Sequence, residues 1–243
     1  MKKMPQFRKR MKEYEVLSET NFIIKLFVYF YRTFFDVKAS MKDKRFKDFG
    51  LTAYVGRQGS GKSISMVERL EQIRRDYPDV VIMTNFGYIH EHEALTDWQQ
   101  LIDCRSPHGI VFAIDEIQNE FDVYESRNFN LEILKVITQQ RKQGIKVLAS
   151  SQVFTRVSKP LREQCFEVVE CYTLSGRWTY QRCFDADDYN NFIDSTNPDK
   201  QFKVPRKWRK NFVQSDRLRS KYDSYAVIQS MTKLVSKNKR KIA

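Results

Sequence analysis

The sequence is poor in the residues that build metal centres and disulfide frameworks. Its 243 residues include only three histidines and four cysteines (Cys104, Cys165, Cys171 and Cys183), and no two cysteines form a Cys-x-x-Cys pair. This scatter argues against both a zinc site and a disulfide framework. No cleavable signal peptide is evident, so we expect a reducing, cytoplasmic location, either free or at the inner face of the cytoplasmic membrane.

A long uninterrupted apolar run is also missing. The aromatic run at residues 22–35 has 14 residues and contains Lys25 and Arg32. As a helix it would rise about 21 Å, which is short of the roughly 30 Å hydrocarbon core of a bilayer. We therefore predict that it does not span a membrane. Its aromatic and basic residues suit a membrane surface or a membrane-protein partner, and equally a helix docked on the rest of the chain or on a neighbouring subunit.

Positive charge is concentrated at the two ends of the chain. Residues 1–50 carry 13 Lys+Arg against 6 Asp+Glu, residues 51–199 carry 16 against 22, and residues 200–243 carry 14 against 2. The three segments therefore have net charges of +7, −6 and +12. Basic arms attract polyanions, which makes nucleic acid or an anionic membrane face the expected partner; the alternative is a pair of solvated tails.

The most informative segment that is present, residues 56–63, fits the phosphate-binding pattern G-x-x-x-x-G-K-[ST]. Residues 51–55 before it favour a strand, and residues 64–76 after it place apolar side chains at helical spacing. This context predicts binding of ATP, with Lys62 reaching the β and γ phosphates and the Ser63 hydroxyl holding Mg²⁺. The predicted nucleotide-binding residues are Gly56, Arg57, Gln58, Gly59, Ser60, Gly61, Lys62 and Ser63.

Two further strand ends carry polar residues that suit hydrolysis. The apolar residues 110–114 are followed by Asp115 and Glu116. We predict that Asp115 binds Mg²⁺ together with Ser63, and that Glu116 orients the attacking water. Residues 145–151 form another apolar run, and Gln152 after it is a candidate sensor of the γ-phosphate.

An arginine supplied by a neighbouring subunit could complete such a site. Arg141 lies just ahead of the 145–151 run, where it could reach a neighbour's nucleotide and stabilise charge in the transition state. Arg162 and, more distantly, Arg127 compete for the role. Each is read as an ordinary surface arginine unless the chain forms an oligomer.

The alternation of strand and helix patterns predicts an α/β fold. Apolar runs at 80–85, 109–114 and 145–151 are typical of buried parallel strands, and 166–174 with 178–184 resemble a hairpin. Helical patterns cover 96–103 and 130–143. Periodicity fades beyond residue 185, and 198–219 is basic with interleaved Phe202, Trp208 and Phe212. That composition suits either a grip on single-stranded nucleic acid or a solvated tail pinned by a few rings.

Taken together, these motifs resemble the zonular occludens toxin family of filamentous phage assembly ATPases, within the FtsK-HerA group of DNA-pumping motors. Between about residues 48 and 174, the resemblance rests on the phosphate-binding loop, Thr84-Asn85, Ile114 to Gln118, Ser126-Arg127, Gln140 to Ile145, Ser151-Gln152, Val157 and Leu161-Arg162. It implies a RecA-like P-loop NTPase fold, a homo-oligomeric ring, and ATP-driven movement, packaging or export of DNA. Family members of the phage-assembly type usually have a spanning helix after the core, whereas residues after 185 are basic and polar here.

We accordingly divide the chain into a basic, aromatic arm (1–47), a P-loop ATPase core with a mainly parallel sheet flanked by helices (48–185) and a basic extension (186–243).

Three other functions stay open. An assembly ATPase of phage or secretion machinery would use the nucleotide without acting on DNA directly. A small-molecule kinase would need arginine-rich lid residues over the phosphates. Asp115-Glu116 with Gln152 fits hydrolysis better than a kinase reaction. A GTPase is disfavoured because no Asn-Lys-x-Asp motif occurs.

Overall fold

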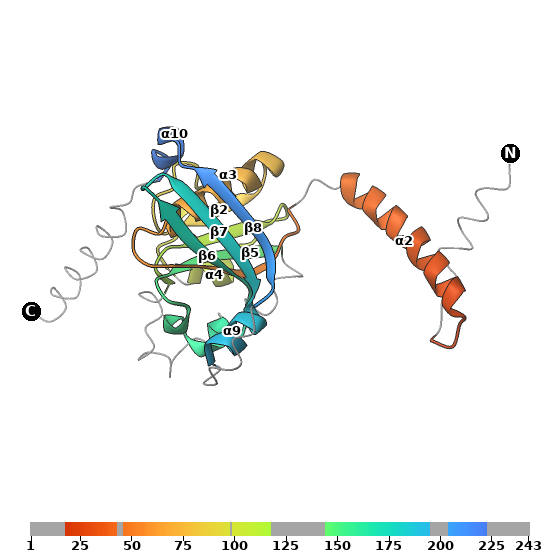
Figure 1. The fold of residues 1–243 in the computed structure, drawn as a ribbon. Helices are drawn as coiled ribbons and strands as arrows, with labels where there is room; N and C mark the ends of the chain where they lie inside the picture. The colour runs from red at the N-terminus through yellow and green to blue at the C-terminus, as the bar shows by residue number, and fades with distance from the viewer. Residues whose placement is uncertain (1–17, 43–45, 98, 118–143, 195–203, 223–243) are drawn as a thin grey trace, which may run out of the picture. The chain divides into compact units, whose positions relative to one another are not determined.

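The computed structural model describes residues 18–42, 46–97, 99–117, 144–194 and 204–222, in two compact units, Met1–Lys44 and Arg45–Ala243. Within the first unit, Figure 1 shows the helix α2 (Phe22–Lys42). It is 21 residues long and continues past the predicted 22–35 run. Phe22, Phe27 and Phe34 are 73%, 64% and 64% exposed. None of the described helices is both long enough and apolar enough to cross a membrane.

The second unit contains one eight-stranded sheet in the order β3-β2-β4-β5-β1-β6-β7-β8. All pairs from β3 to β6 are parallel, while the β6–β7 and β7–β8 pairs are antiparallel. This mostly parallel sheet with flanking helices confirms the predicted fold class. The strands are β1 (Gly50–Val55), β2 (Val81–Thr84), β3 (Glu93–Ala94), β4 (Ile110–Ile114), β5 (Ile145–Ser151), β6 (Cys165–Leu174), β7 (Trp178–Asp185) and β8 (Arg206–Val213).

Both faces of the central sheet are buried because successive side chains of a strand point to opposite faces. On one face, α3 (Lys62–Asp76) packs its fully buried Met66, Val67 and Leu70 in one core with Tyr54 of β1. The opposite core contains odd-numbered residues of β1, such as Leu51 and Ala53, with Phe154 and Leu161 from the segment after β5. The shorter helical elements are α4 (Gln99–Asp103), η2 (Phe154–Arg156), α8 (Lys159–Arg162), α9 (Ala186–Asp194) and α10 (Asp216–Arg219).

The strand order determines where the predicted functional residues can meet. β5 lies between β4 and β1, and all three run parallel, with Ile114 opposite Ala149 and Val55 opposite Ser151. The carboxyl ends of β1, β4 and β5 are therefore neighbours at one edge of the sheet. Loops at that edge are where open α/β sheets bind ligands.

The structure differs from the sequence prediction beyond residue 185. Residues 206–213, for which we predicted no strand, form β8, which pairs with β7 along its length and ends the sheet (Figure 1). This segment is therefore a strand and not a solvated tail. Its sequence, Arg-Lys-Trp-Arg-Lys-Asn, lacks the apolar pattern by which a strand is predicted. An edge strand can lack this pattern because it is held by backbone pairing and tolerates charged side chains. The helix predicted at 96–103 is shorter, and that at 130–143 lies outside the described residues.

Candidate functional site

The phosphate-binding loop runs from the end of β1 to the start of α3. Gly61, directly before α3, has φ +89°, a conformation that favours glycine over any residue with a side chain. A Cβ atom on Gly56 would lie 2.7 Å from the Cys171 carbonyl oxygen, and one on Gly61 would collide with the Thr173 hydroxyl of β6. The loop is thus pressed against β6 as closely as glycine allows.

The loop fits a bound phosphate in two respects. It leads into the amino terminus of a 15-residue helix, where the helix dipole favours an anion. In addition, the Ser60 hydroxyl is buried and has no hydrogen-bond partner among the described groups. Buried hydroxyls are rarely left unpaired, so this one suits a ligand oxygen. Arg57 and Gln58, in contrast, are exposed.

Ser63 and Asp115 lie together although 52 positions separate them. The Ser63 hydroxyl donates to Asp115 Oδ2 at 2.8 Å, and Ser150 Oγ donates to the other carboxylate oxygen. Asn85, directly after β2, accepts from the Asp115 backbone N–H at 2.7 Å and donates to its carbonyl oxygen at 3.1 Å. Hydroxyl and carboxylate oxygens are ligands that Mg²⁺ prefers, so Ser63 and Asp115 would hold this ion.

Glu116 joins the ends of the three strands. Its carboxylate lies 3.7 Å from the Lys62 ammonium and accepts a hydrogen bond from Gln152 Nε2 at 3.4 Å. Its backbone has φ +52°, which is uncommon for a residue with a side chain, and its N–H donates to Ser150 Oγ at 2.9 Å. Lys62 itself is only 6% exposed. The structure thus brings together Lys62, Glu116 and Gln152.

The predicted arginine is not placed. Arg141 and Arg127 lie outside the described residues. Arg162 ends the short helix α8 and is half-buried, and its Nε is buried without a hydrogen-bond partner in the described part of the chain. Which arginine acts on a neighbouring subunit stays a prediction.

Sequence reasoning assigned no role to Asn85 or Ser150, which position Asp115 and Glu116. Both lie at or next to the carboxyl end of a strand that pairs with β4. A polar residue that ends an otherwise apolar strand was the available signal. The strand order was needed to show that β2 and β5 flank β4.

The thiol of Cys171, beside the loop, is uncharged at neutral pH. Burial raises the pKa of Cys171, whose backbone contacts the loop, to about 12, and Cys165 and Cys183 have the same value for the same main reason. Cys171 Sγ lies 3.5 Å from the Ser65 hydroxyl of α3. The Cys171 side chain therefore places no negative charge beside the loop.

Comparison with solved structures supports the fold. The chain is similar to the N-terminal domain of zonular occludens toxin from Neisseria meningitidis, with a TM-score of 0.53 and 16% identity over 72% of this chain and 98% of that one. It also matches B204, the DNA-packaging ATPase from Sulfolobus Turreted Icosahedral Virus, with a TM-score of 0.44 and 14% identity over 57% of this chain and 93% of that one. No protein-family model matches the chain, and no curated protein matches it. The expected resemblance to the zonular occludens toxin is confirmed at the level of the fold.

Proposed function

We propose that this chain is an ATP-hydrolysing motor that moves, packages or exports DNA of a phage or mobile element. The observation that carries the proposal is the 2.8 Å hydrogen bond between Ser63 and Asp115, which joins the phosphate-binding loop to the acidic strand end beside Glu116. The likeness of the fold to that of the zonular occludens toxin domain supports it.

The geometry suggests a role for each residue. Lys62 would bind the β and γ phosphates of ATP, and a phosphate there would compete with Glu116 for the Lys62 ammonium. Glu116 would then be available to accept a hydrogen bond from the attacking water, while Gln152 holds its second carboxylate oxygen. Mg²⁺ would neutralise charge that develops on the phosphate oxygens. Asn85 and Ser150 act on this chemistry only by positioning Asp115 and Glu116.

DNA as the substrate is inferred from charge, and a homo-oligomeric ring as the working form is inferred from the arginine predicted to act in trans. The terminal segments carry +7 and +12, which favours a polyanionic partner. The arginine predicted to act in trans, Arg141, lies outside the described residues, and we infer from its place ahead of β5 that a neighbouring subunit supplies it. We expect this motor to work in the cytoplasm, at the inner face of the cytoplasmic membrane where the export of DNA requires it.

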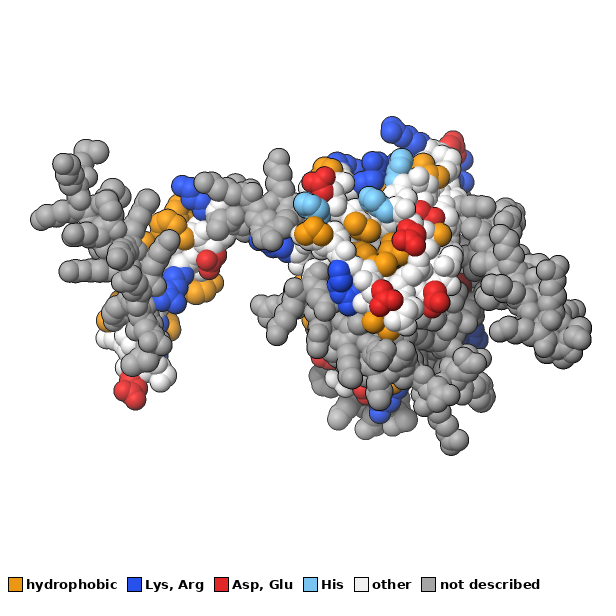
Figure 2. Space-filling model, turned by 180° about the vertical axis from the view of Figure 1, so that it is seen from behind, with side chains coloured by type: hydrophobic (Ala, Val, Ile, Leu, Met, Phe, Trp, Pro, Cys, Tyr) orange, Lys and Arg blue, Asp and Glu red, His pale blue; other side chains and the backbone are white. Residues whose placement is uncertain are grey.

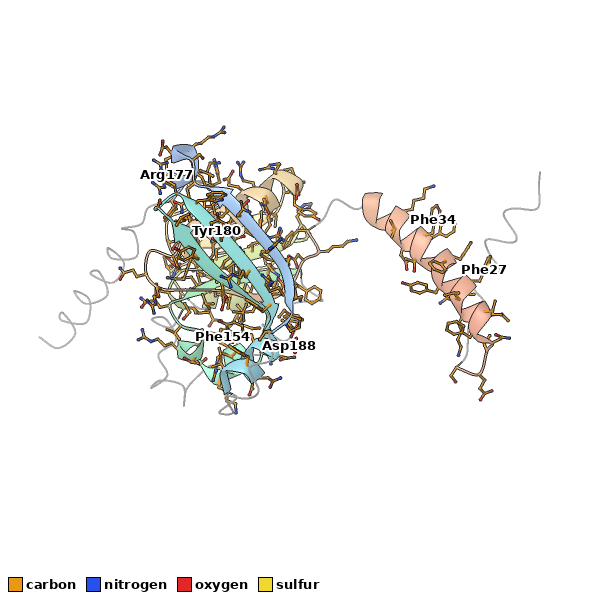
Figure 3. All side chains as sticks on the ribbon, viewed as in Figure 1. Phe27, Phe34, Phe154, Arg177, Tyr180 and Asp188 are labelled. Carbon is orange, nitrogen blue, oxygen red and sulfur yellow. The ribbon has the colours of Figure 1, made fainter. Side chains whose placement is uncertain are left out.

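A second candidate function is supported by α2. Phe27 and Phe34 are seven residues apart, so they lie along one side of this helix (Figure 3), and both are 64% exposed. Exposed rings on a helix with basic residues suit a membrane surface or a membrane-protein partner. In this alternative the chain is a membrane-associated assembly ATPase that does not act on DNA directly. A small-molecule kinase stays the least supported function.

The ATPase assignment is tested by two substitutions with opposite effects on binding. Lys62→Ala is expected to abolish ATP binding, because it removes the cation that meets the phosphates. Glu116→Gln is expected to keep ATP binding but to lower the turnover rate about 10²- to 10⁴-fold, because the amide cannot accept the proton of the water. Binding is measured with a fluorescent ATP analogue and turnover by phosphate release.

The matched control is Glu163→Gln, the same change at an exposed carboxylate whose ion pair with Lys159 spans 3.8 Å. It should leave both quantities unchanged. Normal turnover by Glu116→Gln would show that another residue activates the water, and unchanged ATP affinity of Lys62→Ala would refute the nucleotide site itself.

A further inference from the structure

The antiparallel strands at one end of the sheet carry an open groove of about 770 Å³ on the face turned away from α3. Strand alternation places Tyr172 of β6, Tyr180 of β7 and Asn211 of β8 in one cross-strand row. Arg182 and Arg209 form a pair on the same face, two residues away along β7 and β8. We call this surface the outer groove. Its lining includes Tyr172, Leu174, Tyr180, Arg182, Arg206, Arg209 and Asn211.

The outer groove is positively charged. Arg182, Arg206 and Arg209 are exposed, and none has an acidic partner among the residues that the structure describes. The carboxylate closest in register, Glu170 opposite Arg182, accepts a hydrogen bond from the Tyr189 hydroxyl at 3.0 Å. The lysines of β8 that point to the other face do have acidic partners. Lys207 pairs with Glu167 at 3.3 Å, and Lys210 pairs with Glu68 at 2.8 Å. The three arginines are thus the charges that β7 and β8 leave for an anionic partner.

Aromatic rings lie beside these arginines. Tyr172 is 59% exposed and Trp178 is 43% exposed. The rings of Trp178 and Tyr180 are 5.2 Å apart and tilted by 31°, and Figure 3 shows Tyr180 on β7. This separation leaves no room for a third ring between them, so the two rings form one continuous platform. Large exposed rings on a sheet are the feature on which unpaired bases stack.

We propose that the outer groove binds single-stranded nucleic acid, with bases stacked on Tyr172 and on the Trp178–Tyr180 platform and with phosphates on Arg182, Arg206 and Arg209. This inference rests on the proposed function in taking DNA as the substrate, and it deepens that function by naming the form of the strand. The paired bases of a duplex show their edges and not their faces in its grooves, so an aromatic platform selects unpaired bases.

The opposite side of the molecule does not offer the same chemistry. Figure 2, seen from behind the view of Figure 1, shows acidic, histidine, basic and apolar side chains mixed on the Arg45–Ala243 unit. The pocket of about 470 Å³ between α3 and the sheet is lined by basic residues that are already paired, such as Lys146 with Asp48 at 3.4 Å. Charge complementarity to a polyanion therefore favours the outer groove.

The test is the affinity of the full chain for a fluorescein-labelled oligothymidylate, measured by fluorescence anisotropy over a range of salt concentrations. Tyr172→Ala should weaken binding about tenfold or more, because a stacking ring is lost, whereas Tyr172→Phe should bind as the unchanged protein does. Arg209→Glu should weaken binding and flatten its salt dependence, because fewer counterions are released. Lys159→Glu makes the same charge change at a side chain that is 78% exposed on α8 and should have little effect.

Any of the following results would overturn the inference: equal loss of affinity in Arg209→Glu and Lys159→Glu, equal affinity of Tyr172→Ala and Tyr172→Phe, or tighter binding of a duplex of the same length. A change of mass in solution in Tyr172→Ala without a change in affinity would instead assign the groove to contact between protein subunits, which also overturns it. An oligouridylate of equal length shows whether the strand bound is DNA or RNA.

ATP turnover without DNA, measured on the same variants, separates this inference from the proposed function. Turnover should be unchanged in all of them, because the outer groove is not part of the nucleotide site. Groove variants that fail to bind DNA but still hydrolyse ATP at the normal rate would support the outer groove as the nucleic-acid site. An unmodified chain that binds the oligonucleotide through Tyr172 and Arg209 but does not hydrolyse ATP would refute the proposed motor and leave the groove in place.

Discussion

Glu116 connects the two halves of the proposed site at the scale of single residues. Its carboxylate lies 3.7 Å from Lys62 of the loop and is hydrogen-bonded by Gln152 of the next strand end. Its left-handed backbone, φ +52°, is maintained by the hydrogen bond from its N–H to Ser150. Unusual backbone conformations cost about 1–3 kcal/mol and persist where the surrounding contacts hold them. The strained conformation positions the Glu116 carboxylate beside Lys62.

The loop glycines offer a prediction with an internal control. Gly61→Ala should lower the affinity for ATP at least tenfold, because a Cβ at φ +89° collides with Thr173 and displaces the loop. Gly176→Ala, in the β6–β7 turn, also has a positive φ (+67°) but meets no atom within 4 Å. That variant should lose only about 1–2 kcal/mol of stability and keep its affinity for ATP. Equal affinities in a nucleotide titration would mean that the loop does not hold the phosphates.

Sequence reasoning named those candidate site residues that belong to local motifs. Lys62, Ser63, Asp115 and Glu116 each stand in a short pattern whose chemistry is explicit. Asn85 and Ser150 do not, because each acts on β4 from a strand that is distant in sequence. Their contacts depend on the pairing of β2 and β5 with β4, which no pattern within a single segment specifies.

At the scale of elements, α3 links the candidate nucleotide site to the end of the described chain. Glu71 of α3 accepts hydrogen bonds from Lys221 Nζ at 2.5 Å, from Arg74 at 3.2 Å and from the Tyr88 hydroxyl. Burial alone would raise the pKa of Glu71, but these hydrogen bonds outweigh it and lower the pKa to about 2. The helix that begins at Lys62 is thus fastened to the segments around β2 and after β8.

This cluster predicts a pH dependence of stability. A folded pKa of about 2, below the ordinary 4.5, means that Glu71 stabilises the fold fully above pH 4.5 and loses this contribution as the pH falls toward 2. Between pH 7 and pH 3, the free energy of unfolding should therefore fall by about 1–2 kcal/mol more in the unchanged protein than in Glu71→Gln. Urea unfolding at both pH values measures this difference.

Glu163→Gln is the control for Glu71→Gln, because Glu163 is 58% exposed and its one ion pair among the described residues is with Lys159 of α8. Its unfolding free energy should vary with pH as that of the unchanged protein does. Identical pH dependence in Glu71→Gln and in the unchanged protein would show that Glu71 does not contribute this stability.

The elements differ in how far they could be predicted. β1, α3, β4 and β5 were found because buried parallel strands are continuous apolar runs and α3 has a clear helical period. β8 was missed because it is a basic edge strand, stabilised by pairing with β7 and not by apolar side chains of its own. The same strand contributes two of the arginines of the outer groove, so that surface could not be assembled from the sequence.

At the scale of the whole molecule, negative and positive net charge lie in different segments of the chain. The middle segment, with net charge −6, contains the candidate nucleotide site, whereas the terminal segments carry +7 and +12. Within the Arg45–Ala243 unit, the arginines of the outer groove belong to β7 and β8, and the loop Gly56–Ser63 follows β1. ATP and nucleic acid would therefore bind at different places on one sheet, as a motor requires.

The most direct test of the central claim is the ATPase rate of the purified chain without DNA, with single-stranded DNA and with duplex DNA, measured alongside its mass in solution with ATP. The proposed motor predicts stimulation by DNA, strongest for the single strand, together with an oligomer that forms in the presence of ATP. A rate that no DNA changes, from a chain that stays monomeric with ATP, would contradict it.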